Sequence, residues 1–287
     1  MPEMPLPDCH VPASTSVGSG AEWQQQYPSW LLAGLKAGSV TDHGGAEEGQ
    51  AFAVEVHRLG ELPLPDGRLI GCDPYLADLT RRPFDLALPP GEHPVGVAIV
   101  RIAADHIRPA ALLLSVSSAP IARWSLAQTV AEPTSAPDDP DDDPATFEVG
   151  AILGYGVDAG TGALLSPSAL PALVEVGNED GGMLEDPLSV AMEESPIEAV
   201  LVAPRPGALV VAQCHSGWGD GVYATWVGWD EGGGVSLVMT DFAVVSDPWN
   251  TDDDASTAAE PAAAAERQAA SPSSGGFWSR LFGRRDR

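Results

Sequence analysis

Residues 215–234 read HSGWGDGVYATWVGWDEGGG, and the path of the chain through this stretch decides how the flanking strands are arranged. Glycine adopts positive φ at no steric cost and aspartate accepts hydrogen bonds from turn amides, so SGWGDG predicts a tight chain reversal. The side chains of 221–229 alternate between two faces, as they do in a strand. We therefore predict that 208–215 and 221–229 are neighbouring antiparallel strands joined by this turn, followed by a looser turn at 230–234.

Short β-branched runs separated by glycine and proline extend on both sides of this stretch. Strands at such spacing are typical of an antiparallel sandwich. We predict a mainly-β (β-rich α+β) fold of antiparallel, sandwich-like sheets with one or two short helices and disordered termini. The predicted strands are 51–58, 67–72, 95–103, 110–117, 146–156, 198–203, 208–215, 221–229 and 235–245.

Two segments have the features of short helices. The first is 29–38, where Ser29 suits an N-terminal cap and Pro28 should prevent the helix from starting earlier. The second is about 185–194, where Pro187 suits the first helical turn. We therefore place one short helix before the strands and one between them.

Changes in composition divide the chain into an ordered domain and several segments outside it. Runs rich in proline, serine, alanine or acidic residues cannot bury enough apolar surface to fold, whereas the β-rich region can. The predicted organisation is a disordered N-terminus 1–20, a helical lead-in 21–50, a mainly-β domain 51–248 with an acidic loop 131–146, a linker 249–276 and a basic amphipathic tail 277–287.

The tail predicts a docking element. On a helix its four large apolar side chains would form one stripe, with arginines on the remaining surface. Such an element could dock in a groove of a partner protein, lie on an anionic membrane, fold back onto the acidic domain, or be a frayed end without a role. The candidate docking residues are Phe277, Trp278, Leu281 and Phe282.

The charge balance restricts the kind of partner. The chain has 14 Lys and Arg residues against 41 Asp and Glu residues, a formal net charge of −27. Such a surface repels nucleic-acid phosphates and anionic lipids, so we expect no nucleic-acid partner and no membrane contact except through 277–287. The charge is compatible with cations or with a basic protein partner, and it is also typical of a surface that only maintains solubility.

Compartment signals point to the cytoplasm. Cys9, Cys72 and Cys214 have neither a disulfide-framework pattern nor metal-ligand spacing. The first twenty residues lack the basic start and apolar core of a signal peptide, and no apolar run approaches the roughly 20 residues of a membrane span. We therefore expect a cytoplasmic protein.

Several aspartates follow or precede predicted strands, and they suggest a site at one rim of the sheets. If their carboxylates converge, they could bind a hard, calcium-like cation, although their spacing matches no cation-binding loop. The alternative is that each aspartate only caps its own turn. The candidate functional rim consists of Asp73, Asp158, Asp220, Asp241, His215, Trp218 and Tyr223.

No catalytic residues are predicted. His215 and Ser216 are adjacent in an extended strand, so their side chains point to opposite faces and cannot act as base and nucleophile. The chain has no GxSxG elbow and no phosphate-binding glycine loop, and we predict no cofactor apart from the cation considered above.

Several motifs together resemble the bacterial domain-of-unknown-function family 4241, over about residues 55–247. They are GRLIGCDP (67–74), RPFDLALPPGEHPVGVAI (82–99), ARWSLA (122–127), YGVDAGTG (155–162) and, above all, SGWGDGVYATWVGWD with LVMTDFAVV. The resemblance implies an accessory or interaction protein, with immunity proteins of toxin systems as one type. We therefore expect a non-catalytic binding protein with an acidic surface for a basic protein partner. The alternatives are an enzyme of unrecognised class and a cation-binding domain that uses the aspartate-rich rim.

Overall fold

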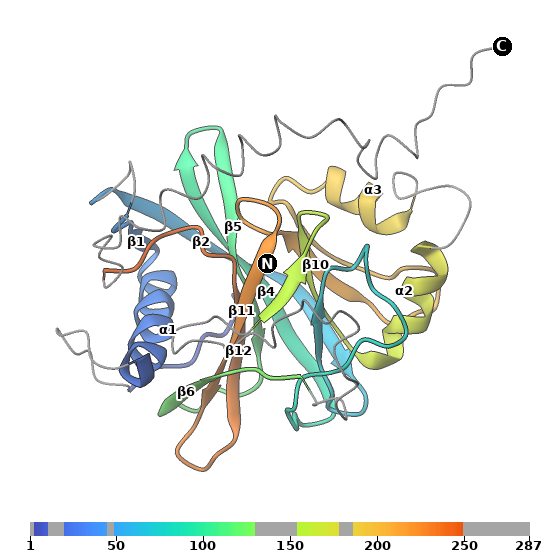
Figure 1. The fold of residues 1–287 in the computed structure, drawn as a ribbon, viewed down its shortest axis with the longest axis horizontal. Helices are drawn as coiled ribbons and strands as arrows, with labels where there is room; N and C mark the ends of the chain where they lie inside the picture. Colours follow the sequence, from blue (N-terminus) through green and yellow to red (C-terminus); the bar gives the residue numbers. More distant parts are fainter. Residues whose placement is uncertain (1–2, 11–19, 45–48, 130–153, 178–185, 249–287) are drawn as a thin grey trace, which may run out of the picture. The chain divides into compact units, whose positions relative to one another are not determined.

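The computed structural model of the 287-residue chain describes residues 3–10, 20–44, 49–129, 154–177 and 186–248 (Figure 1). Contacts divide the chain into two units, Met1–Trp249 and Asn250–Arg287, and all described residues belong to the first. The predicted acidic loop, linker and tail lie outside the described residues.

The described chain is β-rich and its named strands pair antiparallel, as predicted from the sequence. Its helices are α1 (Gly20–Ala37), α2 (Leu170–Gly177), which a short 3-10 helix at Pro167–Ala169 precedes, and α3 (Pro187–Glu193). Its strands are β1 (Ser39–Thr41), β2 (Ala51–Leu64), β3 (Ile70–Cys72), β4 (Gly91–Ala103), β5 (His106–Ser115), β6 (Arg123–Leu126), β7 (Gly154–Val157), β8 (Thr161–Leu165), β9 (Ala199–Val202), β10 (Val211–His215), β11 (Gly221–Trp229) and β12 (Val235–Asp241).

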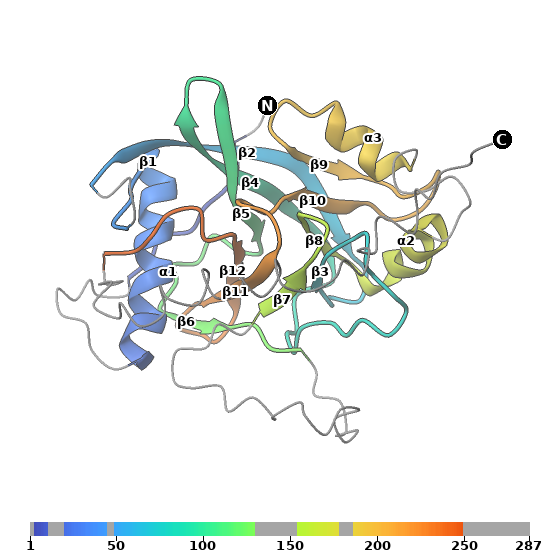
Figure 2. The same cartoon turned by 45° about the horizontal axis from the view of Figure 1, so that its top comes forward.

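The strands form two sheets (Figure 2). The larger has the order β1-β2-β4-β5-β12-β11-β6, and β7 also pairs with β11. The smaller has the order β3-β8-β10-β9. On one side of β11, the first residues pair with β7 and the last ones with β6, so this strand connects three segments that are far apart in the sequence.

The two sheets and the helices share two hydrophobic clusters. Alternation along the smaller sheet sends Leu164 and Cys214 into the cluster that the larger sheet and α1 form. Leu165 and Val211, on the other face of the same sheet, instead join the cluster that includes Leu170 of α2 and Leu188 of α3. The smaller sheet is therefore covered on one face by the larger sheet and on the other by α2 and α3.

The predicted pairing of 208–215 with 221–229 is wrong. β10 lies between β8 and β9 in the smaller sheet, whereas β11 lies in the larger sheet. Residues 216–220 therefore carry the chain from one sheet to the other. The reason is that β8, which the sequence prediction missed, occupies the edge of β10 where β11 was expected.

Helix α1 is longer than predicted, because it begins at Gly20 and includes Pro28. A proline inside a helix removes one backbone hydrogen bond at a cost of about 3 kcal/mol, which is why an earlier start was excluded. Burial of one face offsets this cost: Leu31 and Leu32 are almost fully buried against the larger sheet. Ser29 is not the cap, since its hydroxyl donates to the Gln25 carbonyl one turn earlier.

The predicted helix at about 185–194 is confirmed as α3. Asp186 caps it, because one carboxylate oxygen accepts hydrogen bonds from the amides of Leu188 and Ser189 at 2.7 and 3.0 Å. Pro187 occupies the first turn, as expected.

Part of the N-terminus that was predicted to be disordered packs on the domain. Met4 is buried, and its side chain packs on Gly96 of β4, where an added Cβ would lie 2.7 Å from the His57 carbonyl oxygen and 3.0 Å from the Met4 sulfur. Cys9 forms a parallel bridge with Ile121. The physical reason is that the apolar Met4 side chain packs where Gly96 of the sheet has no side chain. The composition of the segment does not reveal such a contact.

Candidate functional site

Asp73 holds the turn that follows β7. Its carboxylate is fully buried directly after β3. One oxygen accepts hydrogen bonds from the amides of Asp158 and Ala159 at 3.0 and 2.7 Å, and the other from the amide of Tyr75 at 3.0 Å. Three otherwise unsatisfied amides thus share one buried acceptor, so this carboxylate is a structural element of the loop.

The same turn is also held from the loop between the sheets, residues 216–220. Asp220 accepts a hydrogen bond from the amide of Gly160 at 3.0 Å, and the amide of Ser216 donates to the Gly160 carbonyl at 3.0 Å. The structure therefore brings Asp73, Asp158 and Asp220 to one place, but the carboxylates of Asp73 and Asp220 bind backbone amides there.

Several contacts hold the backbone of residues 216–220. The Tyr223 hydroxyl lies 3.0 Å from the Ser216 carbonyl and 2.6 Å from the Gly219 carbonyl, and it donates its proton to these two acceptors. Gly217 has a φ of 54°, and a Cβ there would lie 2.7 Å from the carbonyl oxygen of Phe242. Tyr223 is thus a support of the loop rather than an exposed site residue.

Trp218 is the exposed residue of this loop, with 59% of its surface accessible. Its indole N–H lies 3.4 Å from the Val244 carbonyl, and the Arg108 guanidinium lies over the ring, 5.2 Å from its centroid. Val222, at the start of β11, is 61% exposed. Trp218 and Val222, four residues apart in the sequence, are therefore two exposed apolar side chains at the point where this loop leads into β11.

Asp241 faces away from the other three aspartates, towards helix α1. Its buried carboxylate accepts hydrogen bonds from the Tyr27 hydroxyl at 2.5 Å and the amide of Ala243 at 2.9 Å. Burial raises the pKa of Asp241 to about 6, and burial together with this carboxylate raises the pKa of Tyr27 well above its usual value. The four carboxylates therefore do not form one rim.

We expect the raised pKa of Asp241 to make stability depend on pH. The folded protein retains this proton to a higher pH than the unfolded chain, so the free energy of unfolding falls as pH rises from about 4 to about 6 and is level above. A shift of about two pKa units corresponds to about 3 kcal/mol. Urea unfolding of wild type and Asp241→Asn across this range measures the contribution as the difference between the two proteins.

A difference that does not change with pH would contradict this origin. Tyr27→Phe supplies a second test, because the Tyr27 hydroxyl lowers the pKa of Asp241 by donating to it. Without that hydroxyl, the upper end of the pH-dependent range should move above pH 6.

His215 and Ser216 have separate partners. The His215 imidazole lies 3.5 Å from the carboxylate of Glu198, while the Ser216 hydroxyl donates to the Gly219 carbonyl at 2.7 Å. Burial raises the pKa of the Cys72 thiol to about 12 and that of Cys214 well above its usual value. Neither His215 with Ser216 nor His215 with Cys214 therefore has the geometry of a base and a nucleophile.

No group of three or more histidine, cysteine, aspartate or glutamate side chains in the described ranges could hold a metal ion. A cation at the predicted rim would have to compete with the amides that Asp73 and Asp220 already bind. We therefore derive no cation chemistry from these residues.

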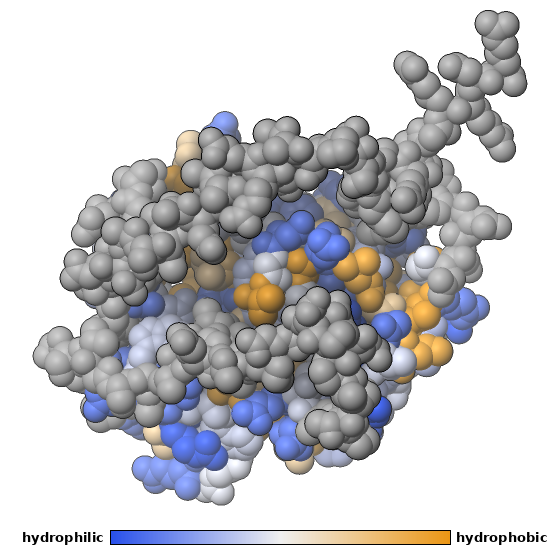
Figure 3. Space-filling view, in the orientation of Figure 1, coloured by the Kyte–Doolittle hydropathy of each residue, from blue (hydrophilic) through white to orange (hydrophobic). Residues whose placement is uncertain are grey.

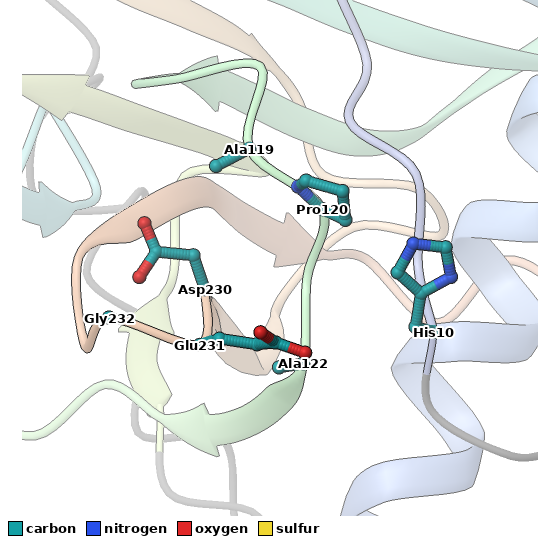
Figure 4. A pocket seen from close by; sticks show the side chains of 7 residues that line it. All are labelled: His10, Ala119, Pro120, Ala122, Asp230, Glu231 and Gly232. Carbon is teal, nitrogen blue, oxygen red and sulfur yellow. The ribbon is translucent and has the colours of Figure 1, made fainter.

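The second glycine-rich turn borders a cavity of about 370 Å³ (Figure 4). His10 of the N-terminal segment lies across Pro120 from the turn that carries Asp230 and Glu231. The Asp230 carboxylate accepts the amide of Gly234 at 2.8 Å and so caps its own turn. The predicted turn at 230–234 is confirmed, as the connection between β11 and β12.

We expect Asp220→Ala to lower the free energy of unfolding by about 1 kcal/mol, because one partly solvated amide loses a charged acceptor. Chemical denaturation measures the change. Asp158→Ala is the matched control, since the exposed Asp158 carboxylate accepts no hydrogen bond within the described chain. Equal effects of the two substitutions would contradict the assigned role.

The sequence prediction missed Arg108 and the exposure of Val222. Arg108 lies in β5 of the larger sheet, and no motif marks it as a partner of a tryptophan more than a hundred residues later. In the sequence, only the presence of an arginine in a predicted strand and of a tryptophan in a predicted turn could have suggested this contact.

The fold defines a class of domain in which two antiparallel sheets pack together and a rigid loop passes between them. Within that class, residues 62–240 match the family model described as "Protein of unknown function (DUF4241)", and the chain belongs to this family. No curated protein and no solved structure matches the chain. None of the helices in the described ranges is long and apolar enough to cross a membrane.

Proposed function

We propose that this protein is a non-catalytic binding protein that docks a basic protein partner on the surface formed by Trp218 and Val222, here called the Trp218 surface. The observation that carries the proposal is the 59% exposure of Trp218 on a loop whose backbone is fixed by Asp220, Tyr223 and Gly160. A large aromatic ring left in water is costly unless a partner covers it.

The rigidity of the loop favours binding. Tryptophan and arginine are the residues most enriched among binding hot spots, and Arg108 already lies over the Trp218 ring. Because hydrogen bonds hold the loop before any partner arrives, little conformational entropy is lost when the complex forms.

Charge supports a basic partner. Asp220 is exposed and lies between Trp218 and Val222 in the sequence, Asp158 is exposed in the turn that Asp220 binds, and the whole chain has a net charge of −27. Opposite charge on a partner would accelerate association and exclude acidic competitors, while the apolar contact would supply affinity.

The setting that fits this role is the reducing cytoplasm of a bacterial cell. Cys72 and Cys214 are buried free thiols and Cys9 is a partly buried one, which suits a compartment where disulfides do not form. An immunity-type protein that neutralises a basic protein by covering part of it would use a surface of this kind. The tail 277–287 remains a predicted second docking element.

The proposal is tested by affinity capture from the cells that produce the protein, with Trp218→Ser and Val222→Ser compared with wild type. Val190→Ser is the control, because Val190 is 42% exposed on α3. We expect wild type and the control to retain a protein of basic isoelectric point and both site variants to lose it. Retention of the same protein by Trp218→Ser would overturn the proposal.

The site variants should remain folded. Trp218→Ser removes one long hydrogen bond, one cation–π contact and an edge contact with the His106 ring, each of which contributes about 1 kcal/mol or less at an exposed position. Thermal melting of each variant therefore accompanies the capture experiment, and unchanged melting assigns a loss of capture to the surface.

A further inference from the structure

A groove of about 440 Å³ lies between the loop that follows β3 and the start of α2. Figures 1 and 2 show this loop passing beside α2. Three arginines, Arg68, Arg81 and Arg82, line the groove. In a chain with only 14 lysine and arginine residues, this concentration of positive charge needs an explanation.

Six basic residues of the described chain have evident partners, although the buried Nε of Arg108 has no hydrogen-bond acceptor there. Four of them pair with carboxylates and two lie over tryptophan rings. By contrast, neither Arg68 nor Arg81 lies within ion-pair distance of a carboxylate in the described ranges. The partnered side chains are Lys36 with Asp8, Arg58 with Glu61, Arg101 with Glu55, Arg205 with Glu175, Arg108 with Trp218 and Arg123 with Trp229.

The Arg81 side chain is held in place by one hydrogen bond, but another of its donors lacks an acceptor. Its terminal nitrogen donates to the Leu76 carbonyl at 3.4 Å, and its amide donates to the Asp78 carbonyl. Its Nε is buried and has no hydrogen-bond partner in the described part of the chain. A buried donor of a charged group without an acceptor is rare, and an anionic ligand in the groove would supply the acceptor.

The nearby carboxylates have other partners. Asp78 accepts hydrogen bonds from the amide and the hydroxyl of Thr80 at 2.7 and 2.6 Å, and Asp66 accepts the amide of Arg68 at 3.3 Å. These local bonds turn both carboxylates towards their own backbone. Neither carboxylate forms an ion pair with Arg68 or Arg81, although the Arg81 charge helps to lower the pKa of Asp78.

Apart from Thr80, whose hydroxyl donates to Asp78, the remaining lining is apolar. Leu79, which is 66% exposed, and Pro83 belong to the loop, and Leu170 and Pro171 belong to the start of α2. Figure 3 shows hydrophobic residues exposed over α2, with hydrophilic residues beside them. Pockets for small ligands have volumes of about 300–1,000 Å³ and combine apolar walls with a few polar anchors, which describes this groove.

From these observations we infer that the groove binds a small phosphate monoester. Guanidinium groups present paired N–H donors that match the oxygens of a phosphate, and several arginines together neutralise its double charge. The organic part of the ligand would lie on Leu79 and the prolines. This site is separate from the Trp218 surface and does not depend on the proposed protein partner.

Isothermal titration calorimetry of the full-length protein at low ionic strength tests this site, with phenyl phosphate, inorganic phosphate and benzoate as probes. We expect phenyl phosphate to bind more tightly than the other two. Arg68→Gln and Arg82→Gln, both at exposed positions, should each weaken its binding about tenfold or more, because each removes a charged donor. Leu79→Ser should weaken binding of phenyl phosphate and leave binding of inorganic phosphate unchanged.

Arg101→Gln is the matched control, because it changes the net charge equally at a distant exposed arginine. It should change the dissociation constant by less than about twofold, since surface charges far apart are screened by salt. The inference is overturned if phenyl phosphate does not bind, if its binding survives both groove substitutions, or if Arg101→Gln weakens it equally. Tighter binding of benzoate than of phenyl phosphate would also contradict it.

Discussion

Asp73→Ala should destabilise the protein by about 3–5 kcal/mol, because three partly buried amides lose their only acceptor at once. Two of these amides, those of Asp158 and Ala159, belong to the turn on which residues 216–220 rest. The loss should therefore spread to the loop between the sheets. Urea unfolding measures the free-energy change, and amide hydrogen exchange shows which amides open.

Two variants make this prediction specific to the buried acceptor. Asp66→Ala removes an exposed carboxylate that accepts one long amide bond and should cost less than about 1 kcal/mol. Asp73→Asn keeps one acceptor oxygen and should be less damaging than Asp73→Ala. If Asp73→Ala unfolds at the same urea concentration as wild type, the carboxylate does not support the loop.

Trp226→Ala should cost a similar amount, about 3–5 kcal/mol, because it removes a fully buried aromatic ring from the contact between β11 and α1. The Trp226 ring lies 5.6 Å from that of Trp23 and 5.8 Å from that of Tyr27, centroid to centroid. These contacts help to hold a helix that contains a proline, so α1 should detach more readily in this variant. Chemical denaturation and hydrogen exchange of the α1 amides measure both effects.

Trp218→Ala is the matched control, since it removes the same side chain from an exposed position and should cost about 1 kcal/mol or less. Trp226→Phe should cost less than Trp226→Ala, because it keeps an aromatic ring and removes an indole N–H that has no partner in the described chain. Comparable decreases in the free energy of unfolding for Trp218→Ala and Trp226→Ala would contradict the assignment of Trp226 to the core and Trp218 to the surface.

Local patterns in the sequence predict the strands but not their partners. The run of aromatic and β-branched residues in 221–229 predicts a strand, and β11 has the predicted bounds, although six consecutive residues of it are buried. β2 continues past its predicted end, because a register shift between Arg58 and Gly60 accommodates a glycine that suggested a turn. β8 is a run of five residues beginning Thr-Gly, too short and too weakly patterned to predict, and missing it led to the wrong partner for β10.

The site depends on contacts between distant parts of the chain, which a single sequence does not show. The Asp220 carboxylate binds an amide 60 residues away, and Asp73 binds amides 85 and 86 residues away. From the sequence, each aspartate equally fits a cap of its own turn. The tertiary structure shows that these aspartates hold the loop, and that Trp218 is the side chain of the loop that is left exposed.

The central claim is that the Trp218 surface contacts a basic protein, and site-specific photocrosslinking in the cells that produce the protein tests it most directly. A photoreactive amino acid is placed at position 218, at 222 or at 79, whose native residues are 59%, 61% and 66% exposed. We predict that positions 218 and 222 crosslink to the same basic protein and that position 79 does not. Crosslinking of all three positions to the same proteins, or of neither 218 nor 222 to any protein, would contradict the claim.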